Sequence, residues 1–210
     1  MLSADVTTSG DRIVFQGDVE IAADVTVKSA DGAAPAGASI TFDKTVNNAV
    51  GDSHDLTLDA GTDGAVVLRG SMGLTRGLGT VDFRSKVSLE PGSGGSAITI
   101  KTAGTANDDV LFNRAVEGPA DLTVDAGAGE ILVASTLGGG TPADALRSFT
   151  AASAVNAPGA LTINAPVASA SLTNPTITFR KDVTAGGAVT LNGNTAAAPA
   201  TAGTPVTIST

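Results

Sequence analysis

The sequence predicts an all-β fold of the β-solenoid type, in which short strands wind in coils around one apolar core. Three observations predict this fold: a composition that favours strands, an internal repeat of two apolar signatures, and cations at positions that a straight strand would bury. We take the 210 residues, 1–210, as one repeat-built segment. The alternative is a tandem pair of immunoglobulin-like sandwiches, which also contain short strands at a spacing of about 8–12 residues.

The composition indicates a core with little aromatic mass. Apolar residues make up 42% of the chain, but there are six Phe, no Tyr and no Trp. Val, Leu, Ile and Ala must therefore fill the core. A chain with 26 Gly and few Lys and Glu favours strands joined by tight turns. The missing Trp, Tyr and Cys argue against the sandwich alternative, as does the absence of a linker at which the pattern restarts.

The first signature is a frame of apolar-x-Phe-x-x-x-Val, which recurs about every 33 residues. We expect six imperfect repeats, centred on Phe15, Phe42, Phe83, Phe112, Phe149 and Phe179. In the Phe149 repeat the Val stands at position 155, as if two residues were inserted. The frame predicts that the six Phe rings stack as one internal column.

The second signature is apolar-Thr-apolar, which follows each Phe frame. Period-2 alternation places its two aliphatic residues on one face of a strand and its Thr on the other. The copies are Val25-Thr26-Val27, Leu56-Thr57-Leu58, Ile98-Thr99-Ile100, Leu122-Thr123-Val124, Leu161-Thr162-Ile163, Val189-Thr190-Leu191 and Val206-Thr207-Ile208. In two repeats an Asp-Ala-Gly turn then leads into a third strand, over 65–68 and 130–133.

The residue between Phe and Val predicts a corner in the chain. In a straight Phe-x-x-x-Val strand the middle residue would point inward, and it is Lys44, Arg114 or Lys181 in three repeats. Burying an unpaired cation is very costly, so the chain must turn between Phe and Val and leave the cation outside. Strands joined by such corners form coils, with about 4.8 Å between neighbouring strands.

Variable loops fit this scheme, because insertions leave a solenoid at its corners. The predicted insertions are rich in Gly, Pro, Ala, Ser or Thr. They are Asp31–Ala38, Gly70–Gly79, Gly92–Gly95, Gly138–Asp144 and Thr195–Thr204.

The segments Phe112 to Gly118, Asp121 to Gly129 and Leu137 to Pro142 resemble the β-strand repeats of very large bacterial exoproteins. These include filamentous-haemagglutinin-like and autotransporter-like adhesins. The resemblance runs over about Ile40 to Gly193 and identifies a repeat class. It implies a right-handed parallel β-helix that serves as a surface stalk, adhesin or filament matrix. The ends depart from the pattern, because neither an export domain nor an anchor nor a capping unit is recognisable.

Charge and length exclude several functions. The net charge is −9, so nucleic acid is not an expected partner. The absence of Cys excludes disulfides and thiol chemistry. No apolar stretch approaches the roughly 18 residues of a membrane span, and the N-terminus lacks the features of a signal peptide.

Candidate chemical groups are few, and we predict no catalytic, cofactor-binding or metal-binding residues. Ser53, His54 and Asp55 share a loop, but sequence neighbours in a loop cannot present the geometry of a Ser-His-Asp triad. A metal site at Asp52, His54 and Asp55 would need further ligands. Polysaccharide cleavage would need carboxylates converging in a cleft, from Asp55, Asp59 and Asp63 or from Asn107–Asp109. Calcium at Asn107–Asp109 is a weak alternative, since that segment matches no known calcium loop.

Other patterns have a structural explanation. The Gly92-x-Gly94 and Gly127-x-Gly129 pairs open no helix and predict no phosphate site. The outward cations Lys44, Lys86, Arg114 and Lys181 could line one edge, although solvation beside acidic neighbours explains them. The Thr of the first six copies of the second signature, Thr26, Thr57, Thr99, Thr123, Thr162 and Thr190, could form one hydroxyl-bearing face. Such a face suggests ice binding, whereas high β propensity alone also explains Thr in strands.

The expected function is that of a structural and adhesive repeat module of a secreted or cell-surface bacterial protein, not an enzyme. The alternatives are a solenoid enzyme that degrades polysaccharide and an ice- or surface-binding solenoid. Expected partners are neighbouring repeats or other copies of the chain, with possible cell-surface or glycan contact. No capping element is recognisable at the first or last predicted strand, near Ile13 and Ile208. We therefore expect these ends to be covered either by more repeats in a longer chain or by other copies that stack head to tail into a filament.

Overall fold

The structure is a computed structural model of the 210-residue chain. It describes residues 1–51, 53–92, 95–139, 144–157, 161–164, 176–179, 183–185, 189–192, 194–197 and 208–209. The described residues form strands, turns and bends, and none of them is helical. The prediction of an all-β chain is therefore confirmed.

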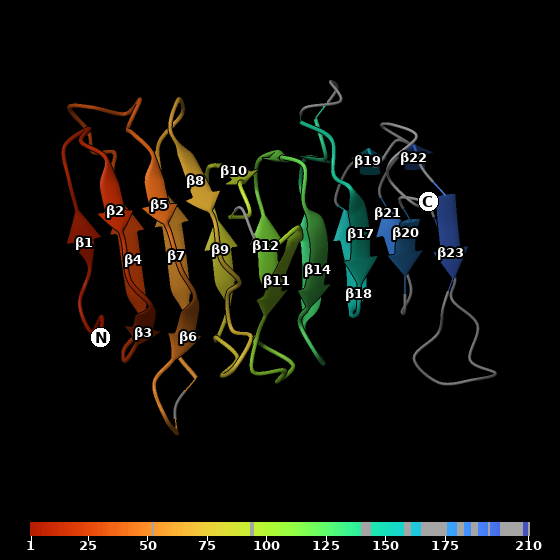
Figure 1. The fold of residues 1–210 in the computed structure, drawn as a ribbon, viewed down its shortest axis with the longest axis horizontal. Helices are drawn as coiled ribbons and strands as arrows, with labels where there is room; N and C mark the ends of the chain where they lie inside the picture. Colours follow the sequence, from red (N-terminus) through yellow and green to blue (C-terminus); the bar gives the residue numbers. More distant parts are fainter. Residues whose placement is uncertain are drawn as a thin grey trace.

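The strands belong to long parallel sheets that run along the molecule (Figure 1). Sheet I has nine strands, in the order β1 (Val6–Thr7), β4 (Val25–Lys28), β7 (Leu56–Asp59), β9 (Val81–Phe83), β12 (Val110–Phe112), β15 (Glu130–Val133), β18 (Ala154–Ala157), β21 (Val183–Ala185) and β24 (Ile208–Ser209). Sheet II has eight, in the order β2 (Ile13–Phe15), β5 (Ile40–Phe42), β8 (Ala65–Leu68), β10 (Lys86–Leu89), β13 (Val116–Glu117), β16 (Thr136–Leu137), β19 (Leu161–Asn164) and β22 (Val189–Asn192).

Sheet III has five strands, in the order β11 (Ala97–Lys101), β14 (Asp121–Asp125), β17 (Ser148–Ala151), β20 (Thr176–Phe179) and β23 (Asn194–Ala197). The pair β3 (Val19–Ile21) and β6 (Val46–Asn48) continues the same row. Met72 joins the two parts, because it bridges in parallel to Val46 on one side and to Ile100 on the other.

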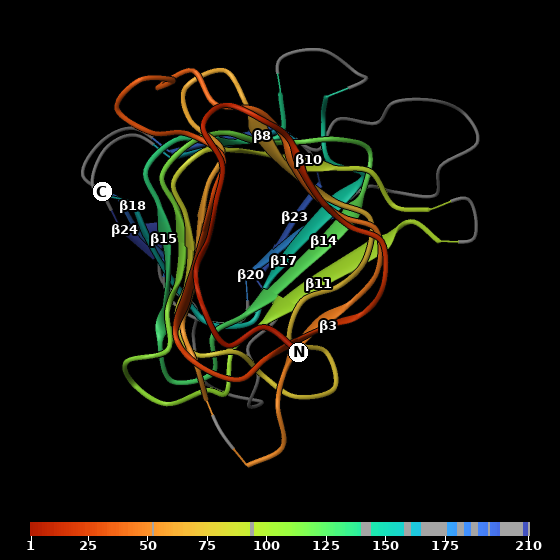
Figure 2. The ribbon, with the colours of Figure 1, turned by 90° about the vertical axis from the view of Figure 1, so that its left-hand side faces the viewer.

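The chain visits the sheets in a fixed rotation of I, II, III. One such passage is called a coil below, and the turns between sheets are the I–II, II–III and III–I corners. In Figure 2, which looks along the molecule, sheet I lies on the left, β8 and β10 at the upper right, and β11 and β14 at the lower right. Every pairing between described strands is parallel, which excludes the antiparallel sandwiches of the alternative prediction.

Coil length varies while strand register does not. Register partners in sheet I are 21 residues apart for Val6 and Val27, and 31 apart for Val25 and Leu56. The predicted insertion Asp31–Ala38 separates β4 from β5, and Gly70–Gly79 separates β8 from β9. The fifth prediction, Thr195–Thr204, is wrong at its start, because β23 extends to Ala197.

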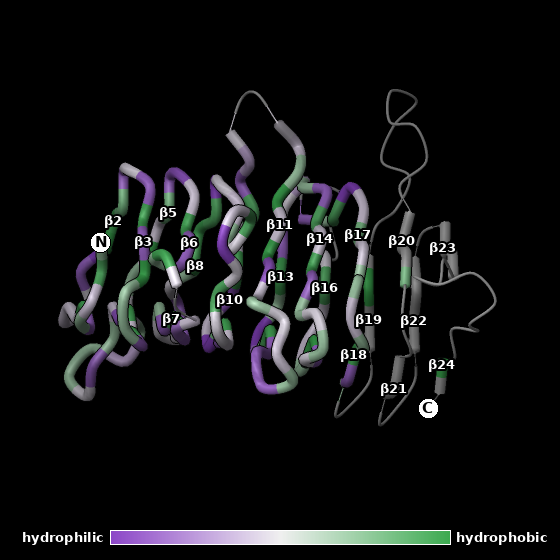
Figure 3. Tube along the Cα trace, turned by 90° about the horizontal axis from the view of Figure 1, so that it is seen from below, coloured by the Kyte–Doolittle hydropathy of each residue, from purple (hydrophilic) through white to green (hydrophobic). Residues whose placement is uncertain are grey.

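The core lies inside the coils, because alternate residues of each strand point inward. Strands β5, β9 and β12 each bury their first and third residues and leave the middle one partly exposed. Figure 3 shows this alternation as hydrophobic and hydrophilic segments along the tube. Parallel strands usually have both faces covered. In the described coils one face packs on the core, and the other carries polar residues together with some aliphatic ones such as Val14 and Leu111.

The six Phe do not form one column, and their spacing does not mark the coils. Phe15 pairs with Phe42 in sheet II, Phe83 pairs with Phe112 in sheet I, and Phe149 and Phe179 lie on neighbouring strands of sheet III. The ring centroids of these pairs are 4.8, 5.3 and 6.3 Å apart, respectively. The prediction of a single Phe column was wrong because a strand with an apolar-x-apolar pattern fits any of the three sheets.

The predicted corners are confirmed where the structure describes them. Phe112 ends β12 in sheet I and Val116 begins β13 in sheet II, with Arg114 exposed between them. Lys44 is likewise exposed between β5 in sheet II and β6 in sheet III. Lys181 lies outside the described residues.

Candidate functional site

A row of side-chain acceptors follows the III–I corner, where each chain segment enters sheet I. The Asp24 carboxylate accepts a hydrogen bond from the backbone N–H of Asp55, and the Asp55 carboxylate accepts one from Thr80, at 3.0 and 2.7 Å. The Thr80 hydroxyl then accepts from Asp109, and the Asp109 carboxylate from Glu130, at 3.3 and 2.8 Å. Each acceptor satisfies a backbone donor of the next coil, so these acidic groups hold coils together.

His54 lies beside this row without forming a catalytic triad. Its Nδ1 is 3.6 Å from an Asp24 carboxylate oxygen, in the preceding coil. Its backbone N–H donates to the Asn48 side chain, and its carbonyl accepts from Gly79. The Asp55 carboxylate is bonded to Thr80. Asp52 lies outside the described residues.

The carboxylates considered for polysaccharide cleavage serve separate local roles. Asp59 accepts a hydrogen bond from the Gly61 backbone at 3.0 Å and pairs with Lys28 at 3.7 Å, whereas Asp63 accepts one from the Thr62 hydroxyl. In the part of the chain that the structure describes, no three His, Asp or Glu side chains form a group that could hold a metal ion.

The segment predicted as a weak calcium site is a turn. Asp108 is buried, and its carboxylate accepts from the Thr105 backbone N–H at 2.9 Å. Asp109 takes part in the acceptor row, and the carbonyl oxygen of Asn107 accepts from the Thr80 hydroxyl at 2.8 Å. Each of these contacts ties the turn to the surrounding chain.

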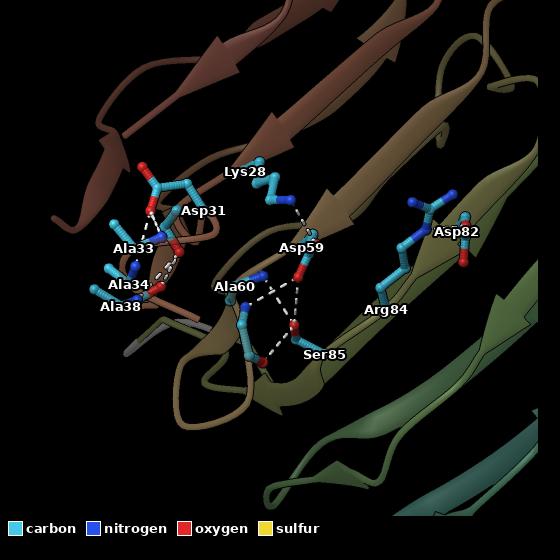
Figure 4. Close-up of polar contacts among 12 residues, drawn as sticks. Lys28, Asp31, Ala33, Ala34, Ala38, Asp59, Ala60, Asp82, Arg84 and Ser85 are labelled. Atoms are coloured by element: carbon cyan, nitrogen blue, oxygen red, sulfur yellow. Dashed lines mark hydrogen bonds and ion pairs between the residues drawn. The ribbon is translucent and has the colours of Figure 1, made fainter. Parts of the chain in front are cut away.

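The Asp-Ala-Gly turn at the I–II corner is held by a serine from the next coil (Figure 4). Gly61 has φ +79°, a left-handed conformation that glycine adopts readily. The buried hydroxyl of Ser85 accepts from the Ala60 N–H at 2.8 Å and donates to the Gly61 carbonyl at 2.9 Å. Ser153 donates in the same way to the second such turn, at Gly127. This motif is a structural joint between coils.

Ion pairs also link successive coils on the outer surface. Arg69 lies between Asp43 of the preceding coil and Glu90 of the next, at 2.8 and 3.0 Å. The pKa of the Arg69 guanidinium is raised, mainly by the hydrogen bond to Glu90 and next by the hydrogen bond to Asp43. Lys101 and Asp125, which are register partners in sheet III, pair at 3.6 Å.

The structure does not support the alternative in which the outward cations line one edge. Lys44 lies at a II–III corner and Arg114 at a I–II corner, whereas Lys86 belongs to sheet II and pairs with Glu117 at 3.3 Å. The fourth, Lys181, is not among the described residues. These cations occupy similar positions relative to Phe in the sequence, but the structure places those positions on different sides of the coil.

The predicted Thr face is divided among all three sheets. Thr26 and Thr57 are partners in sheet I, Thr99 and Thr123 in sheet III, and Thr162 and Thr190 in sheet II.

Sheet III instead carries a column of hydroxyl residues that sequence analysis found only in part. Strand pairings and the Met72 bridges place six residues in one register row: Thr45, Ser71, Thr99, Thr123, Thr150 and Thr178. This row is called the hydroxyl column below. Its first member, Thr45, donates from its hydroxyl to Asp18 at 2.7 Å, and hydrogen bonds from the Thr45 hydroxyl and backbone lower the pKa of Asp18.

Comparisons with known proteins do not place this chain. No protein-family model, no curated protein and no solved structure matches it. The resemblance to adhesin repeats therefore stays a prediction. No helix in the described part of the chain is long and apolar enough to cross a membrane.

Proposed function

We propose that this chain is a segment of a right-handed parallel β-helix, and that it is a structural and adhesive module of a secreted or cell-surface bacterial protein. The fixed rotation through sheets I, II and III supports the solenoid. Its hand is supported by Figure 2, where the chain starts nearest the viewer and recedes clockwise from sheet I over sheet II to sheet III. Right-handed connections are the rule between parallel strands.

The observation that carries the proposal is the continuity of polar links between coils. The acceptor row, the serine joints and the Asp43–Arg69–Glu90 bridge each connect one coil with the next. Each added coil lengthens the rod by about 4.8 Å. A rod tied at its corners and along its sheets resists bending, which suits a stalk or a spacer that holds a binding surface away from the cell.

The first coil supports association with a second copy of the chain. Strands β1 and β2 are the outermost strands of sheets I and II. Val14 is 42% exposed, Phe15 stacks on Phe42, and both Val14 and Phe15 line a cavity of about 300 Å³ together with Leu2. Unpaired strand edges beside apolar side chains are templates for another strand. We propose that the last coil of a second copy packs here, giving an open head-to-tail filament.

Val14→Pro tests this assembly. Ile13 and Phe15 bond to the next coil, so strand alternation directs the Val14 N–H to the open edge. Proline removes that donor at little cost to an extended edge strand. Sedimentation velocity at rising concentration should show self-association of the wild type and of the matched control Val14→Thr, but not of Val14→Pro. Ile208→Lys, in β24, should act in the same way from the other end. A wild-type chain that stays monomeric would refute filament formation.

The proposed location has its own test. Antibodies raised against the chain, applied to intact cells of the source organism before and after mild protease treatment, should lose their signal if the module is outside the cell. A signal that appears only after the cells are lysed would place the module inside and overturn the surface role. Incubation with polysaccharides should release no reducing ends, and release would replace this proposal with the enzyme alternative.

The hydroxyl column favours a second candidate, binding to an ordered surface such as ice. Its members recur at the strand spacing of about 4.8 Å. The hydroxyls of Thr99, Thr123 and Thr150 make no hydrogen bond to described protein atoms. Ice-affinity partitioning should be reduced by Thr123→Leu but not by Thr57→Leu on sheet I. Equal exclusion of the wild type and both variants from ice would eliminate this candidate.

A further inference from the structure

Described residues from the II–III corners of three successive coils line one groove. Seven residues, 90–96, connect β10 with β11, and ten residues, 138–147, connect β16 with β17. Between these two corners only three residues, 118–120, connect β13 with β14. The groove that the described residues of these corners line has a volume of about 440 Å³. Ligand sites are typically about 300–1,000 Å³ in volume.

The walls of the groove come from all three corners. The first corner contributes Glu90, Pro91 and Ser96, the short corner contributes Pro119, and the third contributes Arg147. Backbone hydrogen bonds fix the corners relative to one another: the Asp121 N–H donates to the Ser96 carbonyl at 2.7 Å, and the Arg147 N–H to the Ala120 carbonyl at 2.9 Å. The groove is thus supported by the strand ladder of sheet III.

The polar groups of the groove differ in whether they already interact with other side chains of the protein. The Glu90 carboxylate is bonded to Arg69 at 3.0 Å and is held in place. Arg147 is partly buried, and among the described residues its side chain takes part in no ion pair. Arginine has five N–H donors and no acceptor, a carboxylate only accepts, and the Ser96 hydroxyl does both.

We infer that this groove binds a segment of a neutral polysaccharide. Sugar hydroxyls both donate and accept, which matches a wall that combines a donor, an acceptor and a hydroxyl. The rings of Pro91 and Pro119 supply rigid apolar surface for the C–H faces of a sugar ring. The fixed Glu90 and the net charge of −9 disfavour polyanionic glycans.

The groove opens beside the outer surface of sheet III. Ser96 and Arg147 immediately precede β11 and β17, in which Thr99 and Thr150 belong to the hydroxyl column. A polymer that leaves the groove along the strands of sheet III therefore meets further hydroxyls. This inference rests on the adhesive role proposed above, and gives that role a ligand class.

A titration followed by amide resonances tests the inference on the 210-residue chain. The probes are cellohexaose, maltohexaose and xylohexaose, with a galacturonate hexamer as the charged comparison. At least one neutral probe should shift the amides of Gly95, Ser96 and Arg147. Arg147→Ala should weaken binding roughly ten-fold, as loss of a charge-assisted hydrogen bond does. Arg114→Ala, which removes an exposed cation from another corner, should leave the affinity unchanged.

The outcomes separate this inference from the proposed function. Shifts caused only by the galacturonate hexamer, shifts elsewhere on the chain, or equal affinities of Arg147→Ala and Arg114→Ala would each overturn the neutral-glycan site. No shift with any probe, at the solubility limit of each, would overturn it as well. Filament formation and surface exposure are measured without sugar, so a negative titration would leave the results of those two tests unchanged.

Discussion

Phe83→Ala removes one ring of the stacked pair in the middle of sheet I. The Phe83 side chain is fully buried, and its register partners are Leu58 on one side and Phe112 on the other. Its ring lies 5.3 Å from the Phe112 ring, at an interplanar angle of 12°. Strands on both sides prevent the site from collapsing, so the substitution should leave a cavity. Phe→Ala changes of this kind cost about 3–5 kcal/mol in the free energy of unfolding.

Phe15→Ala is the matched comparison, because the same side chain is lost from the outermost strand of sheet II. Phe15 is only partly buried and stacks on Phe42. Its removal should cost roughly 1–2 kcal/mol, since less apolar surface returns to water and the site is open on one side. Urea unfolding followed by far-UV circular dichroism gives both values, provided that the urea dependence (m-value) is unchanged.

The difference between the two variants is the decisive result. A stability loss for Phe83→Ala no greater than that for Phe15→Ala would mean that sheet I does not enclose Phe83 between two strands. A second check compares the double variant Phe83→Ala and Phe112→Ala with the two single variants in the same unfolding assay. Stacked rings should show a coupling energy of about 0.5–1.5 kcal/mol, and purely additive losses would contradict the stacking.

Three further predictions follow from the links between coils. Asp55→Ala should lower the free energy of unfolding by about 1 kcal/mol, whereas Asp55→Asn, which keeps an acceptor oxygen, should lose less in the same urea assay. Gly127→Ala should lower the free energy of unfolding by at least about 1 kcal/mol, because φ is +61° and the new Cβ would lie 2.4 Å from the Cα of Gly104. Gly92→Ala is the control and should be near neutral, because a Cβ there would have no atom within 4 Å. Hydrogen bonds from Thr45 lower the pKa of Asp18 below 3.8, so its stabilising effect is present above pH 3.8 and is lost as the pH falls through the lower, folded-state pKa. Asp18→Asn should make the urea midpoint of unfolding less dependent on pH in that acid range. An unchanged dependence would contradict the role of Asp18 in the acid sensitivity of stability.

Burial arguments were enough to predict the strands and corners. The signature Leu122-Thr123-Val124 lies in β14, with its aliphatic residues buried and Thr123 partly exposed, as period-2 alternation requires. The cost of burying Arg114 correctly required a turn after Phe112. Such inferences succeed because they depend on one strand and its own neighbours in sequence.

Assignment to a sheet could not be made from the sequence, because all three sheets accept the same pattern. Val25-Thr26-Val27 pairs with Leu56-Thr57-Leu58, and that strand pairs with Val81-Asp82-Phe83. The two signatures that appear distinct in sequence are thus equivalent positions in sheet I. Which strand pairs with which depends on corner length, and corner length varies.

The hydroxyl column and the acceptor row were missed for a related reason. Thr45 and Ser71 belong to the hydroxyl column, but neither stands between two apolar residues in sequence. The acceptor row did leave a signal: an Asp stands directly before the first apolar residue of β4, β7 and β12. Its meaning depends on register between coils, because each carboxylate bonds to the chain one coil later.

Binding surfaces on such a chain should arise at corners, because strands and corners tolerate change differently. A residue added within β14 would shift Leu122 and Val124 out of the core and break the ladder on both sides. Added corner residues cost little, since each doubling of a loop costs only about 0.6 kcal/mol in closure entropy. The three-residue corner 118–120 contributes Pro119 to the wall of the II–III groove. Lengthening the 118–120 corner with glycines should therefore fill the groove and abolish glycan binding, while the far-UV spectrum stays unchanged. Retained binding in that variant would mean that the ligand is held elsewhere.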